Sequence, residues 1–155
     1  MKLIWRFQLF FVYFIKIGTV FDRELLKVLN SIIMTQEEKE LLLKDLCARL
    51  NYHPFIKGKE GYAINEGRLV GVFTSGIVIM TGGGTRHHYF WKEAKPYLRS
   101  LSKMTKAEKK ELFQLMGNGT DVERIDFYNE HHLDYRGLIP MGLALEAPKD
   151  MYKTN

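Results

Sequence analysis

The histidines are the residues of this 155-residue chain whose side chains could most readily bind a metal or take part in catalysis. His131 and His132, with Asp134 two positions later, carry donor atoms that transition metals bind. Adjacent residues on a helix point about 100° apart, so these two imidazoles cannot both face one ion from a regular turn. His87 and His88 form a second pair, but no helical metal motif such as H-E-x-x-H is present. We therefore predict no metal site and no cofactor.

The same histidines have a structural interpretation. One is expected to pack against Tyr128 or Tyr135, and the other to be solvated or hydrogen-bonded to Asp134.

Carboxylates recur along residues 121–134, but such a run is typical of a solvated helix face. No Ser-His-Asp, Cys-His or paired-carboxylate arrangement stands out, so the chain is predicted not to be an enzyme. A metal-dependent hydrolytic enzyme is the most distant alternative. The recurring acids are Asp121, Glu123, Asp126, Glu130 and Asp134.

The glycine run within residues 81–86 could cradle a phosphate, because it follows an apolar stretch. It lacks the G-K-[S/T] ending of a P-loop, and residues 87–91 predict a strand rather than a helix. A hairpin loop is the favoured interpretation.

The segment 86–110 is basic and rich in aromatic residues. Small barrels that bind nucleic acids combine aromatic stacking with cationic contacts to the backbone. The alternative is that the aromatic side chains point inward while the lysines are solvated. If nucleic acid binds here, the candidate contacts are Arg86, Lys92, Lys95, Lys103 and Lys106.

Arg99 is unusual among these cations because it lies between Leu98 and Leu101. We predict that it is buried against an acid such as Asp134 or Glu130 and that it joins the sheet to a helix. The residues expected to serve the structure are Tyr97, Arg99, His132, Asp134, Tyr135 and Gly137.

Composition favours one ordinary globular domain, with 46% hydrophobic and 26% charged residues. The net charge of +5 is uneven, since residues 57–110 carry +7 and residues 111–155 carry −4. Attraction between these parts is one explanation, and a basic surface that faces phosphates is another. The single cysteine, Cys47, is predicted to be buried, and it suits a reducing, cytoplasmic location.

Residues 1–33 differ from the rest, because they are rich in Phe, Ile, Leu, Lys, Asn and Tyr. Their longest charge-free run, residues 7–15, is too short for a membrane span, which needs about 20 apolar residues. We hypothesise that Met34 is the true initiator, so that residues 34–155 form the domain. If residues 1–33 are genuine, an amphipathic membrane-surface segment is the alternative.

Three S/T-x-x-E capping boxes predict helices over residues 35–50, 105–116 and 120–136. Gly137 and Pro140 are expected to end the last helix, and the apolar tail 138–145 is expected to dock on the core. Between the helices, short β-branched and aromatic runs predict antiparallel strands. The expected fold is therefore α+β, with an SH3-like barrel or bent sheet. The strands are expected at residues 55–57, 62–65, 69–74, 77–80 and 87–91.

Several phrases carry a resemblance: residues 34–50, KPYLR (95–99), LSKMT (101–105), HHLDYRGLI (131–139) and GLALEAP (142–148). In these the chain resembles a group of small uncharacterised proteins of gut anaerobes and of their phages and mobile elements. The resemblance covers residues 34–152 and is weakest across 51–90. Members of the group begin at the equivalent of Met34. It implies a phage or mobile-element association and supplies no catalytic residues.

The function predicted from the sequence is a small non-enzymatic interaction module. Its first expected partner is a protein, and its second is a nucleic acid bound through residues 86–110.

Overall fold

A computed structural model of the chain describes residues 34–58 and 66–152. The chain divides into two compact units, residues 1–35 and 36–155, and the described part belongs almost entirely to the second. The extension 1–33 and the predicted strand 62–65 lie outside the described residues. Within the described ranges, no helix has both the length and the apolar character that crossing a bilayer requires.

The first predicted helix is present as α2 (Gln36–Ala48), and a single 3₁₀ turn, η1 (Leu50–Tyr52), follows it. Leu42 and Leu46 form a buried apolar stripe along it. The prediction for Cys47 is wrong, because its side chain is exposed. The helix instead buries Asp45 and Arg49, which face a stretch of irregular backbone with carbonyl groups to satisfy.

Among the described residues, the sheet has six strands in the order β4-β3-β2-β1-β5-β6, and it is not closed into a barrel. Strands β1 to β4 pair antiparallel, as predicted, and β5 pairs antiparallel to β1, whereas β6 pairs parallel to β5 and makes the sheet mixed. The strands are β1 (Phe55–Gly58), β2 (Glu66–Phe73), β3 (Gly76–Met80), β4 (Arg86–Phe90), β5 (Ala94–Leu98) and β6 (Leu145–Glu146).

The glycine run forms the β3–β4 hairpin loop, as predicted. Thr81 donates its backbone N–H to the carbonyl of Thr85 at 3.1 Å, which closes the loop. Gly84 has a φ of 78°, a conformation that residues with a Cβ rarely adopt.

Strand β5 was not predicted from the sequence. It is short and contains Pro96, which cannot donate a hydrogen bond to a neighbouring strand. The strand forms because η2 (Trp91–Glu93) turns the chain after β4, so that β5 can pair with β1. Trp91, predicted as the end of a strand, instead begins this turn and donates its indole N–H to Thr74 O at 2.9 Å.

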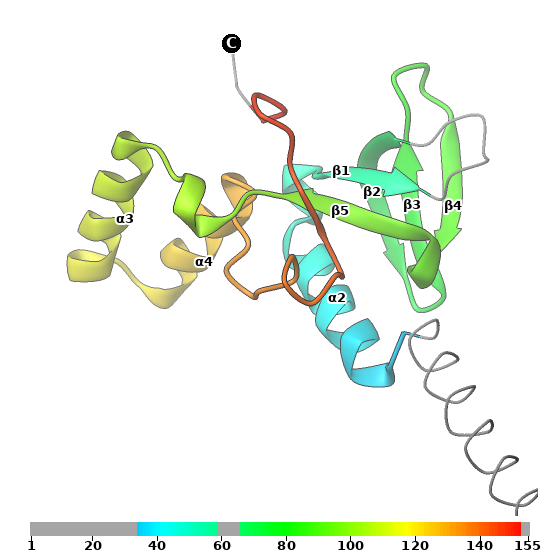
Figure 1. Ribbon diagram of the computed structural model, residues 1–155, viewed down its shortest axis with the longest axis horizontal. Helices are drawn as coiled ribbons and strands as arrows, with labels where there is room; N and C mark the ends of the chain where they lie inside the picture. The colour runs from blue at the N-terminus through cyan, green and yellow to red at the C-terminus, as the bar shows by residue number, and fades with distance from the viewer. Residues whose placement is uncertain (1–33, 59–65, 153–155) are drawn as a thin grey trace, which may run out of the picture. The chain divides into compact units, whose positions relative to one another are not determined.

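Both C-terminal helices begin at their predicted capping boxes. They are α3 (Lys106–Asn118), capped by Thr105, and α4 (Asp121–Glu130), capped by Thr120. The two-residue link between them turns the chain back, so that α3 and α4 form a helical hairpin. In Figure 1 this hairpin extends away from strands β2, β3 and β4.

Helix α4 ends at Glu130, six residues before the predicted end. His132 has a φ of 52° and leaves the helix. Its carbonyl accepts from Arg99 N, and Asp134 N donates to Arg99 O, each at 2.8 Å. Backbone pairing with the segment after β5 therefore replaces the last helical turns.

The apolar tail docks as expected. Leu138 is fully buried, Leu143 and Ala144 are buried, and Met141 remains exposed. Ala147 N donates to Leu98 O at 2.7 Å and so extends the β5–β6 pairing.

Candidate functional site

A buried ion pair between Asp45 on α2 and Arg49, the residue that follows α2, positions the helical hairpin relative to the sheet. Arg49 Nε lies 2.7 Å from Asp45 Oδ2, and neither side chain is exposed to solvent. The Arg49 guanidinium also donates to the carbonyl oxygens of Tyr128 (3.3 Å) and Leu133 (2.8 Å). Because these carbonyls end α4 and begin the segment after it, one side chain fixes where the hairpin joins the body.

Tyr135, predicted to be structural, has two cations within reach of its ring. The guanidinium carbons of Arg49 and Arg136 lie 5.4 and 4.7 Å from its ring centroid, which is within the range of cation–π attraction. Its ring also stacks on Tyr128 at 5.0 Å. Arg136 Nε lies 3.2 Å from Asp45 Oδ1, so this carboxylate balances two buried or half-buried cations.

Asp134 was predicted to pair with Arg99, but its carboxylate instead accepts hydrogen bonds within a turn of the backbone. Its two carboxylate oxygens accept from Leu138 N at 2.7 Å and Ile139 N at 2.9 Å. Gly137, predicted to be a helix C-cap, has the expected positive φ of 74°, but it lies in this turn, beyond the end of α4. The Asp134 carboxylate therefore holds the start of the apolar tail.

His132 and Tyr152 fasten the C-terminal end of the described chain. Their rings stack with centroids 3.8 Å apart. Tyr152 Oη donates to Tyr97 O at 2.7 Å and accepts from Phe55 N at 3.0 Å, which ties this end to two strands. Burial lowers the pKa of His132 to about 3, and the nearby positive charge of Arg49 adds to this effect. The sequence had suggested Tyr128 or Tyr135 as histidine partners, and both suggestions are wrong for His132.

Tyr97, a buried residue of β5, links two strands of the sheet. Its hydroxyl donates to Glu66 Oε1 at 2.7 Å, across the sheet. Burial, assisted by this hydrogen bond, raises its pKa to about 12.

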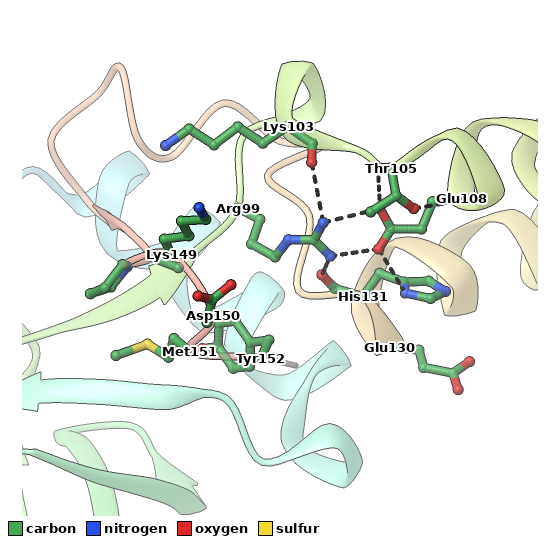
Figure 2. A pocket seen from close by; sticks show the side chains of 12 residues that line it. Arg99, Lys103, Thr105, Glu108, Glu130, His131, Lys149, Asp150, Met151 and Tyr152 are labelled. Atoms are coloured by element: carbon green, nitrogen blue, oxygen red, sulfur yellow. Dashed lines mark hydrogen bonds and ion pairs between the residues drawn. The ribbon is translucent and has the colours of Figure 1, made fainter. Parts of the chain in front are cut away.

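Arg99 pairs with Glu108 on α3, and not with Asp134 or Glu130 as predicted. Its Nη1 lies 2.6 Å from Glu108 Oε1, and its guanidinium also reaches the carbonyls of Lys103 and His131 (Figure 2). The hydrogen bond from Arg99 lowers the pKa of Glu108 to about 2. Glu108 also accepts from Thr105 N at 2.6 Å, so the helix cap and the ion pair share one carboxylate.

His131 completes this group. Its ring packs on Phe127 with centroids 4.5 Å apart, and its Nδ1 lies 3.3 Å from Glu108 Oε1. A cleft of about 660 Å³ opens beside the group, between the start of α3, the end of α4 and residues 147–152 (Figure 2). Because Arg99 is bound to Glu108 and Lys103 to Glu146, charges at this cleft join segments of the chain to one another.

Replacement of Arg99 tests whether the ion pair with Glu108 stabilises the fold. An Arg99→Ala chain is expected to lose about 2 kcal/mol of unfolding free energy, because Glu108 and two backbone carbonyls lose a half-buried donor. Arg99→Lys should lose less, since the ammonium keeps its charge but lacks the two-pronged geometry. Lys95→Ala, which removes an exposed cation from the preceding strand, should change stability by less than about 0.5 kcal/mol. Urea unfolding measures all three, and an Arg99→Ala chain as stable as the wild type contradicts the assignment.

The tentative nucleic-acid contacts are spread over several elements. Arg86 begins β4 and Lys95 lies on β5, and three strands separate these two in the sheet. Lys92 is in η2, Lys103 is in η3 (Leu101–Lys103), and Lys106 begins α3. All five are exposed, but they lie on five different elements.

The α3–α4 hairpin shows a feature that the sequence analysis did not single out. Phe113, Met116, Val122 and Ile125 expose 78, 65, 67 and 40% of their surface. The helices touch through another side, where Arg124 Nη1 donates to Leu115 O and Gly119 O.

Within residues 34–58 and 66–152, no three His, Cys, Asp or Glu side chains are placed to share a metal ion. Searches against protein-family models, curated proteins and solved structures found no match for this chain.

The buried pair was the main element missed from the sequence, although a signal for it exists. Asp45 and Arg49 are spaced i, i+4 and share a helix face with Leu42 and Leu46. A charged pair interleaved with an apolar stripe indicates a buried ion pair. The partners of Arg49, by contrast, lie about 80 positions away, and no local pattern could identify them.

Proposed function

We propose that this chain is a non-enzymatic interaction module that binds a protein through the α3–α4 hairpin. The observation that carries the proposal is the exposure of four large apolar side chains on two adjacent helices: Phe113, Met116, Val122 and Ile125. Single exposed apolar residues are ordinary, whereas a group of them marks a surface that another molecule covers.

The anchoring of the hairpin supports this proposal. Arg49 fixes the end of α4 and Arg99 fixes the start of α3, so both ends of the hairpin are attached to the body by guanidinium groups. A rigid scaffold that presents an apolar helical surface loses little conformational entropy on binding. Aromatic side chains such as Phe113 often act as the anchors of protein interfaces.

The arrangement of β1 to β5 is a second, weaker support. A single 3₁₀ turn precedes β5, which returns to pair with β1, and we propose that these strands form an SH3-like arrangement. Domains of that class bind many kinds of partner, so the fold does not select one. Cytoplasmic location and phage association stay hypotheses that rest on the single cysteine and on the sequence resemblance.

A photocrosslinking amino acid in place of Phe113 tests the proposal in the full chain, in cells that express the protein naturally. We expect a covalent adduct with a protein. The matched control is the same substitution at Phe90, an aromatic residue on β4 that is 64% exposed. If Phe113 gives no more adduct than Phe90, the hairpin is not the docking surface.

A Phe113→Ser/Val122→Ser chain gives an independent readout. It should keep its unfolding free energy within about 0.5 kcal/mol per substitution, because these side chains are exposed. Its affinity for the crosslinked protein should fall by about 2 kcal/mol or more. The alternative function is nucleic-acid binding through residues 86–110. The affinity for nucleic acid would not change with these substitutions, and it would fall steeply as the salt concentration rises.

A further inference from the structure

The exposed face of α3 combines apolar and basic side chains. At about 100° per residue, Lys106, Lys109 and Lys110 all lie within about 60° of Phe113 on the helix surface. All three lysines are exposed, and none forms an ion pair with a described residue. The acids of α3 are elsewhere, since Glu108 is buried against Arg99 and Glu111 lies on the opposite side of the helix.

The exposed face of α4 combines apolar and acidic side chains. Asp121 and Asp126 each lie within about 40° of one of the exposed residues Ile125 and Val122. Glu123 is exposed as well, whereas Glu130, at the end of the helix, lies at the cleft beside Arg99. The one base of this helix, Arg124, is turned toward α3 and donates to Leu115 O and Gly119 O. It also donates to the Asp121 carboxylate on its own helix.

The hairpin is therefore complementary to a copy of itself. A two-fold axis parallel to the helices places α3 of one copy on α4 of the other, twice, and so pairs basic with acidic faces. A two-fold axis perpendicular to the helices places α3 on α3, where like charges repel. Both arrangements bury the same apolar residues, and charge decides between them.

We propose that the protein bound by the α3–α4 hairpin is a second copy of this chain, and that the two hairpins form a four-helix bundle. This inference rests on the proposed function, because it names the partner of the same surface. In such a bundle, Phe113, Met116, Val122 and Ile125 of both copies supply the apolar core, as facing helices do in four-helix bundles. The lysines of α3 and the acids of α4 form its rim.

Charge reversal in the full-length chain tests this inference. One variant carries Lys109→Glu and Lys110→Glu, which makes α3 acidic, and the other carries Asp121→Lys and Asp126→Lys, which makes the exposed face of α4 basic. Each homodimer of these variants would oppose like charges at both contacts. A heterodimer of the two variants would oppose unlike charges at both contacts. Sedimentation equilibrium measures the association, and circular dichroism verifies that each variant is folded.

The wild type is expected to be a dimer, each variant alone to associate about tenfold or more weakly, and the equimolar mixture to form a one-to-one heterodimer. One chain that carries all four substitutions should again form a homodimer, which keeps the test decisive if either variant is unstable alone. A monomeric wild type, or variants that associate as the wild type does, overturns the inference. If the wild type is monomeric but Phe113 crosslinks to a different protein, the proposed function stands and the second copy is excluded.

Discussion

An Arg49→Met chain is expected to lose about 3–5 kcal/mol of unfolding free energy, the cost that accompanies removal of one partner of a buried ion pair. Asp45, which is not exposed to solvent, would then retain only the cation of Arg136 at 3.2 Å. The carbonyls of Tyr128 and Leu133 would lose their donor at the same time. The loss is expected to be large because the side chains of Asp45 and Arg49 are both fully removed from solvent.

Urea unfolding measures this loss, and Lys44→Met is the matched control. Lys44 is an exposed cation on the same helix, so its replacement should cost less than about 0.5 kcal/mol. A double variant, Asp45→Leu/Arg49→Met, should be more stable than Arg49→Met alone, because it leaves no unpaired carboxylate. Equal stability of the single and double variants would show that the charge of Asp45 is not the cause.

A His132→Asn chain is expected to lose the acid sensitivity of the wild type between pH 6.5 and 4.5. Because the pKa of His132 is lowered to about 3 in the folded chain, its stabilising contribution is complete above its ordinary value of 6.5. It declines as pH falls from there toward 3, since only the unfolded chain takes up the proton readily. At pH 5 the wild type should have lost about 2 kcal/mol relative to its stability at neutral pH.

Asparagine is the suitable replacement because it tolerates the positive φ of 52° at this position. The pH window also separates His132 from Glu108, whose pKa of about 2 makes its contribution decline only below its ordinary value of 4.5. His131→Asn serves as the control, since it removes a neighbouring imidazole that is not fully buried. The comparison uses the urea midpoints of each chain at pH 7 and pH 5. If the midpoint of His132→Asn falls between these two pH values as much as that of the wild type, the assignment is refuted.

The sequence alone correctly indicated the α+β class, the helix starts and the hairpin loop of residues 81–85. These features follow from local chemistry: Thr105 and Thr120 accept from the backbone N–H groups of Glu108 and Glu123 three residues later, and Gly84 permits a positive φ. The docking of the tail followed from composition, because residues such as Leu138 and Leu143 are too apolar to remain in water.

Only the tertiary structure decided where α4 ends, which acid pairs with Arg99 and which faces of α3 and α4 remain exposed. Each depends on groups distant in sequence, such as Arg99 with His132 or Arg49 with Leu133, and helical periodicity carries no information about them. An apolar stripe indicates that a helix face is covered, but not what covers it. Along α2 the body of the same chain covers the stripe, whereas along the α3–α4 hairpin large apolar residues such as Phe113 and Val122 remain exposed.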